Sequence, residues 1–540
     1  MRLVRGVAAV LVLVVVVVTV TRFETGGGSA ARLPPGLRVA TTTRTNVIMI
    51  VTDDQRWDTL WAMPHVQSLL VKHGVTFANS FVSDSLCCPS RASILTGNYA
   101  HTTKIYDNHP PNGGALEFQK SGDQNSTIAT WLKAGGYDTG LFGKYLNSYR
   151  GGVPPGWDRW VSFETVGHRV EGAGGYPEAA AYTEYGAYTN APGACHDGLD
   201  SCELPKQKMY STTYYGNAAT NFIDTAPASK PVFVYYTPYA PHAPSIPQLR
   251  YAQRFPHLKP YRPPSFNEAN ISDKPPWMRD LPRFDSVQDQ QINADRRAQF
   301  QTLLTVDNQV AAIVRSLRRT NRLAHSVILF ASDNGVSWGE HRQPAATKQL
   351  AYEEDLRVPL VVRYEPYTSR PSIDHHLIAN IDWAPTMASI AGVPQPATAG
   401  RSFAPLLGKG RLRTPWRTQF LLEHLDGNPP SLAPSFCGIR STRYMYALYQ
   451  GGWQELYNLH KDPFELQNIA SRPAEAPLIA RMRALLHREC QPPPPGYTGG
   501  GPRTFKHTYP RVLSPCVRAV NKLRRYHQLF YQSGYAVCNK

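Results

Sequence analysis

The 540-residue sequence has no apolar stretch as long as the roughly 20 residues that a membrane-spanning helix needs. Its longest apolar run, Val7–Val20, has 14 residues and follows Arg2 and Arg5. A basic start, a short apolar run and small residues up to Ala31 are typical of an export signal, which we predict over residues 1–31. The alternative is an uncleaved N-terminal anchor, the one membrane association that the sequence indicates. No cysteine follows the run closely, so a lipid-modified N-terminus is not indicated.

Acidic residues are absent from Cys490 to Lys540, a segment that carries eight lysines and arginines. This segment supplies about half of the net charge of +17. A basic tail over residues 489–540 either attracts an anionic substrate or surface, or is simply a soluble cap on the protein. The sequence contains no nucleic-acid-binding motif and no internal repeat, so charge alone does not predict a nucleic acid partner.

The chain is not short of core-forming residues, because 42% are hydrophobic and only 18% are charged. This composition excludes a disordered chain. Apolar strands alternate with helical patterns over residues 45–400, which predicts an α/β domain with a large, mostly parallel sheet between helices. The predicted helices are Asp58–His73, Thr127–Lys133 and Asp295–Arg319, and the predicted strands are residues 46–52, 137–142, 231–237, 327–332 and 360–362.

The character of the sequence changes after residue 400. Two predicted antiparallel strands, residues 444–449 and 455–459, flank a Gly451–Gly452 turn, and a helix follows near residues 474–488. We therefore predict a smaller C-terminal antiparallel sheet subdomain over residues 401–488. Two segments lack a clear period: residues 151–191 are interpreted as a surface excursion, and the proline-rich residues 245–290 as a lid or substrate loop.

Eight cysteines are compatible with disulfides in an exported protein. Cys195 and Cys202 are close enough in sequence to close one loop. Four others allow three different pairings, which the sequence leaves open; they are Cys437, Cys490, Cys516 and Cys538. The remaining two, Cys87 and Cys88, are neighbours in a different context.

Oxygen-bearing side chains follow two of the predicted strands at the points where the strands end. Asp53 and Asp54 follow the first, and Asp333 and Asn334 follow another, about 280 residues later. Open α/β sheets bind ligands at the carboxyl ends of their strands, so these side chains are expected to meet at one edge of the sheet. Carboxylate and amide oxygens predict a hard divalent cation, Ca²⁺ or alternatively Mg²⁺.

Cys87 lies between these two strand ends, in the string Cys-Cys-Pro-Ser-Arg that ends at Arg91. Pro89 fits the first position of a helix and Gly97 its end. A helix start favours an anion, and a thiol there is expected to ionise readily.

The whole string resembles the signature of the sulfatase family. The resemblance extends over residues 45–470, and the residues of its motifs are most similar to those of N-acetylglucosamine-6-sulfatases and bacterial arylsulfatases. Further matching blocks are residues 52–55, 143–145, 241–244, 333–335, 348–359 and 456–459. It implies an alkaline-phosphatase-like fold and the hydrolysis of a sulfate monoester, either an aryl sulfate or a sulfated sugar such as N-acetylglucosamine-6-sulfate.

The resemblance also implies a modified nucleophile. In the family, a formylglycine-generating enzyme oxidises the first cysteine of the signature before folding, which here makes Cys87 a Cα-formylglycine (3-oxoalanine). One hydroxyl of the hydrated aldehyde attacks sulfur, and loss of a proton from the other releases sulfate. The implied cation ligands are Asp53, Asp54, Cys87, Asp333 and Asn334, and the implied catalytic or substrate-binding residues are Cys87, Arg91, Lys144, Asn147, His242 and Lys348.

One position departs from the family pattern. Many members carry histidine two residues after the strand lysine, where this chain has Leu146. The base for sulfate release is therefore unassigned, with His101 and His109 as weak candidates. Two other functions stay open: a phosphonate or phosphate ester hydrolase of the same fold, and an inactive binder of polyanions.

Overall fold

A computed structural model describes residues 44–500, except for 164–186, 190–201, 204–208 and the shorter gaps 244, 369, 409–411, 413 and 428–430. The predicted export signal and most of the basic tail lie outside these residues. The described residues belong to one compact unit that begins at Thr43. None of their helices is both long enough and apolar enough to cross a bilayer.

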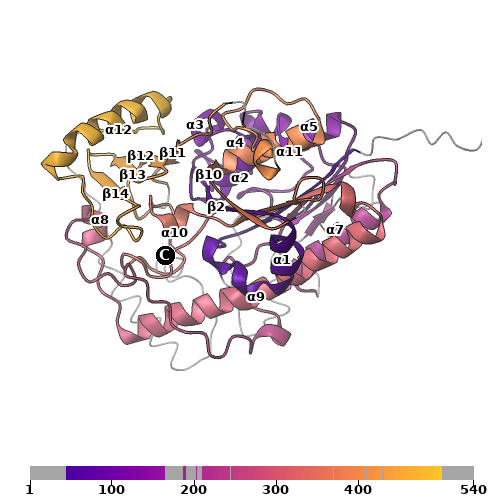
Figure 1. Ribbon diagram of the computed structural model, residues 1–540, viewed down its shortest axis with the longest axis horizontal. Coiled ribbons are helices and arrows are strands. Elements are labelled where there is room, and N and C mark those ends of the chain that lie inside the picture. The colour runs from indigo at the N-terminus through magenta and orange to yellow at the C-terminus, as the bar shows by residue number, and fades with distance from the viewer. Residues whose placement is uncertain are drawn as a thin grey trace, which may run out of the picture. The chain divides into compact units, whose positions relative to one another are not determined.

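A ten-stranded sheet forms the centre of the fold, in the order β10-β2-β9-β8-β1-β7-β3-β4-β5-β6 (Figure 1). Its strands are β1 Asn46–Thr52, β2 Val75–Phe81, β3 Asp138–Gly143, β4 Arg159–Phe163, β5 Ala187–Thr189, β6 Cys202–Glu203, β7 Val232–Thr237, β8 Ser326–Ser332, β9 Leu360–Tyr364 and β10 Ser372–Ala379. β1 pairs in parallel with both β7 and β8, whereas β9 is antiparallel to its neighbours. The predicted large, mostly parallel sheet is confirmed.

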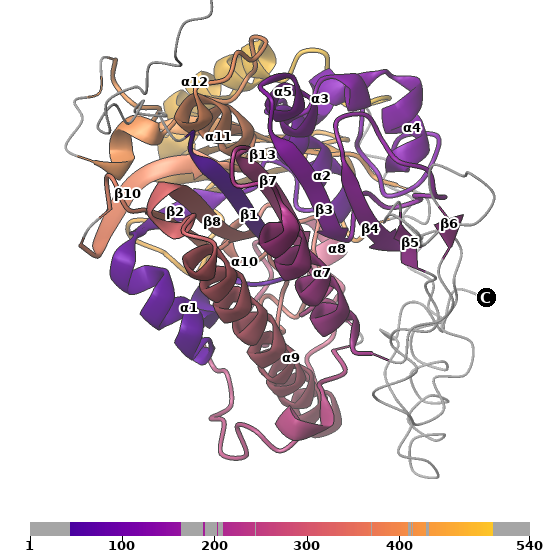
Figure 2. The same cartoon turned by 90° about the vertical axis from the view of Figure 1, so that its right-hand side faces the viewer.

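Strand β1 is apolar throughout because helices cover both faces of the sheet. Val47, Met49 and Val51 face one core, and Ile48 and Ile50 face the other. Figure 2 shows the two helical layers. The first contains α2 Cys87–Thr96, α3 Ala100–Thr103, α4 Gly114–Lys120, α5 Ile128–Ala134 and α11 Trp383–Ala391, and the second contains α1 Pro64–Leu69, α7 Ser211–Thr225 and α9 Ser286–Arg319.

The predicted helix Asp58–His73 is wrong as one continuous element. The structure has a 3-10 helix at Trp57–Ala62, then α1 Pro64–Leu69, then a second 3-10 turn at Val71–His73. Pro64 causes the break because it has no N–H to continue the preceding turn, yet it fits the first turn of a new helix.

The predicted helix at 295–319 is longer than the apolar pattern indicated. Helix α9 begins at Ser286, where the Asp285 carboxylate accepts hydrogen bonds from the backbone N–H groups of Val287 and Gln288. The Gln288 side chain in turn accepts from the backbone N–H of Asp285 and completes a capping box. The cap therefore adds nine residues before the predicted start.

The C-terminal part contains a separate four-stranded antiparallel sheet, as predicted. Its strands are β11 Gln419–His424, β12 Phe436–Ser441, β13 Tyr444–Tyr449 and β14 Gln454–Asn458, and helix α12 Ala476–Glu489 follows. Gly451 and Gly452 have positive φ values of 86° and 78° in the turn between β13 and β14. The predicted hairpin is therefore confirmed.

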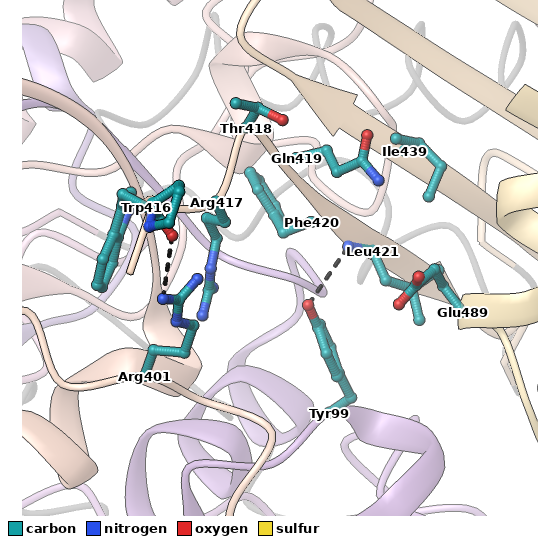
Figure 3. Close-up of a pocket in the computed structure, with 11 residues that line it drawn as sticks. Tyr99, Arg401, Trp416, Arg417, Thr418, Gln419, Phe420, Leu421, Ile439 and Glu489 are labelled. Carbon is teal, nitrogen blue, oxygen red and sulfur yellow. Dashed lines mark hydrogen bonds between the residues drawn. The ribbon is translucent and has the colours of Figure 1, made fainter. Parts of the chain in front are cut away.

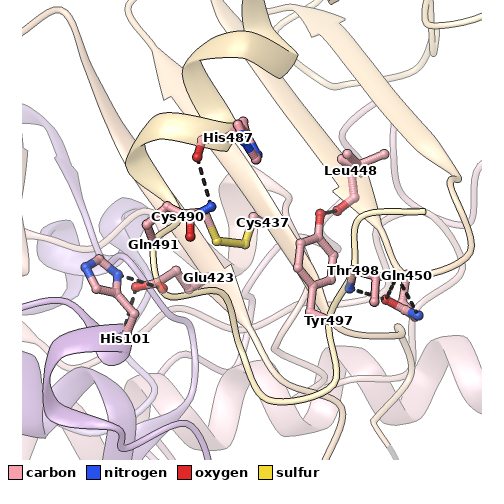
Figure 4. The surroundings of a disulfide bond; sticks show 10 residues. All are labelled: His101, Glu423, Cys437, Leu448, Gln450, His487, Cys490, Gln491, Tyr497 and Thr498. Carbon is pink, nitrogen blue, oxygen red and sulfur yellow. Dashed lines mark hydrogen bonds and ion pairs between the residues drawn. A yellow bond between two sulfur atoms is a disulfide. The ribbon is translucent and has the colours of Figure 1, made fainter. Parts of the chain in front are cut away.

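A disulfide joins Cys437 on β12 to Cys490 at the end of α12 (Figure 4). This selects one of the pairings that the sequence left open. Cys195, Cys516 and Cys538 lie outside the described residues.

The proline-rich residues 245–290 pack onto the rest of the chain with little regular structure, apart from a 3-10 helix at Leu249–Tyr251, α8 Pro276–Arg279 and the start of α9. Ile271, Trp277 and Met278 are buried in a core that also includes residues of the C-terminal sheet. The lid function of this segment stays a prediction.

Candidate active site

The two acidic strand ends meet because β1 and β8 pair in parallel and in register. Thr52 is opposite Ser332, so Asp53 and Asp333 follow side by side, and the Asp333 N–H donates to the Thr52 carbonyl at 3.0 Å. The Asp54 N–H donates to Asp333 Oδ1 at 3.2 Å. Asp54 adopts a left-handed conformation, with φ of 62°, that turns the chain at this edge. The predicted convergence is confirmed in geometry.

Helix α2 brings Cys87 to these carboxylates. Cys87 is the first helical residue, so Pro89 occupies the third position and not the predicted first. The cap comes from a distant side chain, since Asn108 Oδ1 accepts the Cys88 N–H at 2.9 Å. Cys87 Sγ lies 3.5 Å from Asp53 Oδ1, and the Lys348 ammonium lies 2.9 Å from the same sulfur. The predicted nucleophile therefore lies at the carboxylate edge.

Arg91 lies one helical turn after Cys87 and is fully buried. Its Nε donates to Asp333 Oδ2 at 2.7 Å, and its Nη2 lies 3.4 Å from Asp53 Oδ2. A third contact, from Nη1 to the Lys144 carbonyl at 3.0 Å, ties α2 to the end of β3. Arg91 thus holds the carboxylates in place as well as neutralising them.

Three further cationic or titratable side chains line the same edge. Lys144 Nζ lies 2.6 Å from Asp53 Oδ2, and Lys348 Nζ lies 2.5 Å from Asp54 Oδ1. His242 Nε2 lies 3.5 Å from Asp54 Oδ2, while its Nδ1 donates to the Ala243 carbonyl at 2.5 Å. With the proton on Nδ1, a neutral His242 presents an acceptor to the site, so it acts as an acid only as imidazolium.

Burial and neighbouring charges shift the pKa values of Asp333 and Asp53 in opposite directions. Burial raises the pKa of Asp333 to about 6, partly offset by Arg91. Burial would also raise the pKa of Asp53, but Lys144, His242 and Arg91 outweigh it and hold that pKa below the usual range.

The expectation of a readily ionised thiol is wrong. Burial, and then the neighbouring Asp53 charge, raise the pKa of Cys87 to about 12. Because Cys87 is only 1% exposed, loss of hydration outweighs the favourable helix start. The thiol itself is therefore a poor nucleophile at neutral pH.

The residues at this edge fit a divalent cation. Asp53, Asp54, Cys87 and His242 offer ligand atoms within 4.8 Å of one another. Asn334 Oδ1 is buried and has no hydrogen-bond partner in the described segments, although the Asn334 amide nitrogen donates to Asp54 Oδ1 at 2.6 Å. Two lysine ammonium groups already lie against the carboxylates, which shows that this edge attracts cations. The oxygen-rich donor set suits Ca²⁺ or Mg²⁺.

The structure assigns no catalytic contact to the three remaining predicted residues, Asn147, His101 and His109. Asn147 has a buried side-chain oxygen with no hydrogen-bond partner within the residues described. His101 pairs with Glu423 at 2.9 Å, and His109 Nδ1 lies 3.0 Å from Ser148 Oγ. Neither histidine has a contact with Cys87 in the described part of the chain, so the base for sulfate release remains unassigned.

Sequence reasoning missed Asp84, three residues before Cys87. Its carboxyl is buried, and neither oxygen has a hydrogen-bond partner of normal geometry among the residues that the structure describes. Burial, Glu423 and Asp107 raise its pKa well above the usual value, with a weak opposing effect from the Leu86 backbone N–H. The only available signal was an acidic residue beside the signature, which is too common to identify a site.

A cavity of about 400 Å³ lies elsewhere, beside the edge strand β11 (Figure 3). Trp416 contacts the guanidinium groups of Arg401 and Arg417 there, and Tyr99 accepts the Leu421 N–H. None of the predicted site residues lines this cavity, so the site is defined by the acidic strand ends instead.

Comparisons with known proteins show which family the chain belongs to. The family model described as Sulfatase matches residues 45–393, and the model described as N-sulphoglucosamine sulphohydrolase, C-terminal, matches residues 339–491. The chain therefore belongs to the sulfatase family and is a sulfatase enzyme.

Curated relatives carry several sulfatase names. The chain is 30% identical over 502 residues to an N-acetylglucosamine-6-sulfatase of Homo sapiens, covering 84% of this chain and 86% of the relative. It is 29% identical over 509 residues to an arylsulfatase of Volvox carteri, covering 82% of this chain and 74% of the relative.

Solved structures confirm the fold. One, in complex with its substrate D-glucosamine-2-N,6-O-disulfate, has a TM-score of 0.66 and 22% identity, and the alignment covers 82% of this chain and 97% of that chain. The phosphonate monoester hydrolase of Agrobacterium radiobacter has a TM-score of 0.63 and 21% identity, with 82% of this chain and 95% of that chain covered.

Proposed function

We propose that this sulfatase cleaves the sulfate ester of a sulfated sugar of the N-acetylglucosamine-6-sulfate type, using Ca²⁺ and a formylglycine at position 87. One observation carries the proposal: Cys87, Lys348 and the carboxylates of Asp53 and Asp54 meet at one buried edge. The sugar is favoured over an aryl sulfate by the relatives named N-acetylglucosamine-6-sulfatase, which the chain matches over most of its length.

Charge balance supports an anionic substrate. Three carboxylates, Asp53, Asp54 and Asp333, face three permanent cations, Arg91, Lys144 and Lys348. A bound divalent cation leaves this edge with a net positive charge, which attracts a sulfate ester. The cation would be held by Asp53, Asp54, Asp333 and Asn334, and would supply Lewis-acid polarisation of a sulfate oxygen.

The chain's own residues then position the reaction. Lys144 and Lys348 are close enough to the carboxylates to exchange these contacts for sulfate oxygens, as point charges. Arg91 keeps position 87 and Asp333 in a fixed relation. His242 would give a proton to the departing sugar oxygen only as imidazolium, a form that burial disfavours by lowering the pKa of His242 and that the nearby Asp54 charge partly restores. The high pKa of the Cys87 thiol makes the thiol a poor nucleophile. An aldehyde hydrate at position 87 would instead supply a hydroxyl as the nucleophile.

Two further proposals concern maturation and location. We infer that a formylglycine-generating enzyme acts on the segment around Cys87 before the chain folds, because the Cys87 thiol is only 1% exposed after folding. We also infer export, because the Cys437–Cys490 disulfide belongs to an oxidising compartment. Similar proteins include an extracellular sulfatase homolog of Drosophila melanogaster, 30% identical over 408 residues, which are 73% of this chain and 34% of the relative.

The decisive experiment joins mass spectrometry of the peptide containing residue 87 with assays on glucosamine-6-sulfate, nitrophenyl sulfate and nitrophenyl phosphate. We expect an aldehyde in place of the thiol, sulfate release that needs Ca²⁺, and much slower phosphate release. Cys87→Ala should abolish turnover, whereas the matched Cys88→Ala should largely retain it. Full activity with an unmodified thiol at position 87 would refute the mechanism, and faster phosphate release would refute the substrate class.

A further inference from the structure

A second group of metal-type side chains lies outside the active site and shares no residue with it. His341, Glu354 and Glu465 offer one ligand atom each, and these atoms all lie within 4.8 Å of one another. Their exposed fractions are 0%, 5% and 1%. The three come from the segment after β8, from helix α10 Glu353–Leu356 and from the segment after β14.

Within the described part of the chain, each of the three side chains has one polar atom without a partner. His341 Nε2, Glu354 Oε2 and Glu465 Oε1 are all buried and form no hydrogen bond to any described residue. Buried polar atoms are almost always satisfied, and three such atoms in one place therefore indicate a missing partner.

The histidine is oriented as metal-binding histidines are. Its Nδ1 lies 2.7 Å from Glu268 Oε2, which fixes the ring and leaves Nε2 for a ligand. The ring also stacks on Tyr352, with centroids 4.3 Å apart. Glu465 is fixed in a similar way, since its Oε2 accepts the Glu353 N–H at 3.0 Å and leaves Oε1 for a ligand.

Charge balance leaves the two carboxylates unmatched. In the part of the chain that the structure describes, no lysine or arginine lies within ion-pair distance of Glu354 or Glu465. The cations nearby are already used by other acids: Arg56 pairs with Glu340, Lys274 with Glu268 and Arg440 with Glu353. A divalent cation would match two buried carboxylates and satisfy all three orphaned atoms.

We propose that His341, Glu354 and Glu465 bind a structural divalent transition-metal ion, with Zn²⁺ as the probe. One imidazole nitrogen with two carboxylate oxygens suits such an ion better than Ca²⁺, which takes oxygen ligands. Binding would require the three ligand atoms, which lie within 4.8 Å of one another, to move to the spacing that Zn–N and Zn–O bonds of about 2.0–2.2 Å set. The ion would join the catalytic sheet to the C-terminal subdomain, because Glu465 follows β14 and the other two ligands follow β8.

The first experiment measures metal content and stability of the full-length wild-type protein, purified without a polyhistidine tag. After dialysis in Ca²⁺ buffer with trace Zn²⁺, we expect about one equivalent of Zn²⁺ by plasma mass spectrometry, in addition to Ca²⁺. Removing it with 1,10-phenanthroline in the presence of Ca²⁺ should lower Tm by several degrees, and added Zn²⁺ should restore it. Absence of a transition metal together with an unchanged Tm would overturn the proposal and show that the cluster holds protons.

The second experiment tests the ligands with variants of similar volume. Glu465→Gln and His341→Gln should each lose the Zn²⁺ equivalent and the response of Tm to Zn²⁺. The matched control is His424→Gln, which replaces another buried histidine, 1% exposed and located on β11. It should retain both. Retention of the metal by Glu465→Gln, or its loss from the control, would contradict the assignment, and the wild-type measurement decides the question if a variant fails to fold.

Discussion

Asp84 shows how strongly one buried group can depend on its neighbours. Among the residues that the structure describes, no lysine or arginine forms an ion pair with its carboxyl, and burial, Glu423 and Asp107 keep its pKa well above the value in the unfolded chain. The folded protein therefore holds a proton that the unfolded chain releases above about pH 4. The folded state is favoured at low pH, and this advantage is lost as the pH rises towards the folded pKa.

Asp84→Asn should remove this pH dependence, because an amide resembles the protonated carboxyl. Between pH 5 and pH 7 the variant should gain stability over wild type by up to about 1.4 kcal/mol per pH unit. Urea unfolding at both pH values measures the difference. The exposed Asp280→Asn is the control, because that side chain stays in water in both states, and its curve should run parallel to wild type. Parallel curves for Asp84→Asn as well would contradict the interpretation.

Lys348 contacts both the thiol position and Asp54, so its charge should act directly on the reacting group. Lys348→Met keeps the chain length and removes the charge. We expect kcat/KM for nitrophenyl sulfate to fall by about 10²–10³-fold, as for the loss of one electrostatic contact to a developing charge. Lys230→Met, on a side chain that is 56% exposed, is the control and should leave kcat/KM unchanged. An equal effect in both variants would argue against a specific role for Lys348.

At the scale of single elements, helix α2 is held mainly by tertiary contacts. Its start is capped by the distant Asn108, and it ends at Gly97, with φ of 72°. A Cβ at Gly97 would approach Pro385 Cδ at 3.1 Å, whereas a Cβ at Gly392, the equivalent end of α11, would meet no atom within 4 Å. The two glycines share a left-handed backbone and differ in packing.

Gly392→Ala should therefore cost only the backbone term, about 1–2 kcal/mol, and Gly97→Ala should cost more. Chemical denaturation of both variants separates the two contributions. The comparison fails if Gly392→Ala is at least as destabilising as Gly97→Ala.

The sequence predicted β1, β7 and β8 because their apolar runs are buried on both faces. It missed β2 and β10, whose patterns are interrupted by polar residues and, in β10, by a register shift between Asp374 and Leu377. The position of the acidic edge that holds Asp53, Asp54 and Asp333 followed from the rule for strand ends. The high pKa of the Cys87 thiol could not be predicted, because burial depends on segments that reach Cys87 from elsewhere in the chain.

At the scale of the whole molecule, the Cys437–Cys490 disulfide ties α12 to the C-terminal sheet and closes a loop with a sequence separation of 53. Replacing both cysteines by serine should lower the free energy of unfolding by about 2–4 kcal/mol. Thermal unfolding with and without a reductant measures this: wild type should lose stability in the reductant, and the double variant should not respond. A reductant-sensitive double variant would show that another disulfide matters more.

The strand order also determines when, during synthesis, the residues of the site can come together. β1 lies between β7 and β8, and Lys348 contacts position 87, so the edge around Cys87 is complete only after Lys348 has been synthesised, about 260 residues later. At typical translation rates of about 5–20 residues per second, that delay lasts roughly 10–50 seconds. During this interval the segment around Cys87 is accessible to a modifying enzyme. Once the sheet has formed, Cys87 is buried and that access ends.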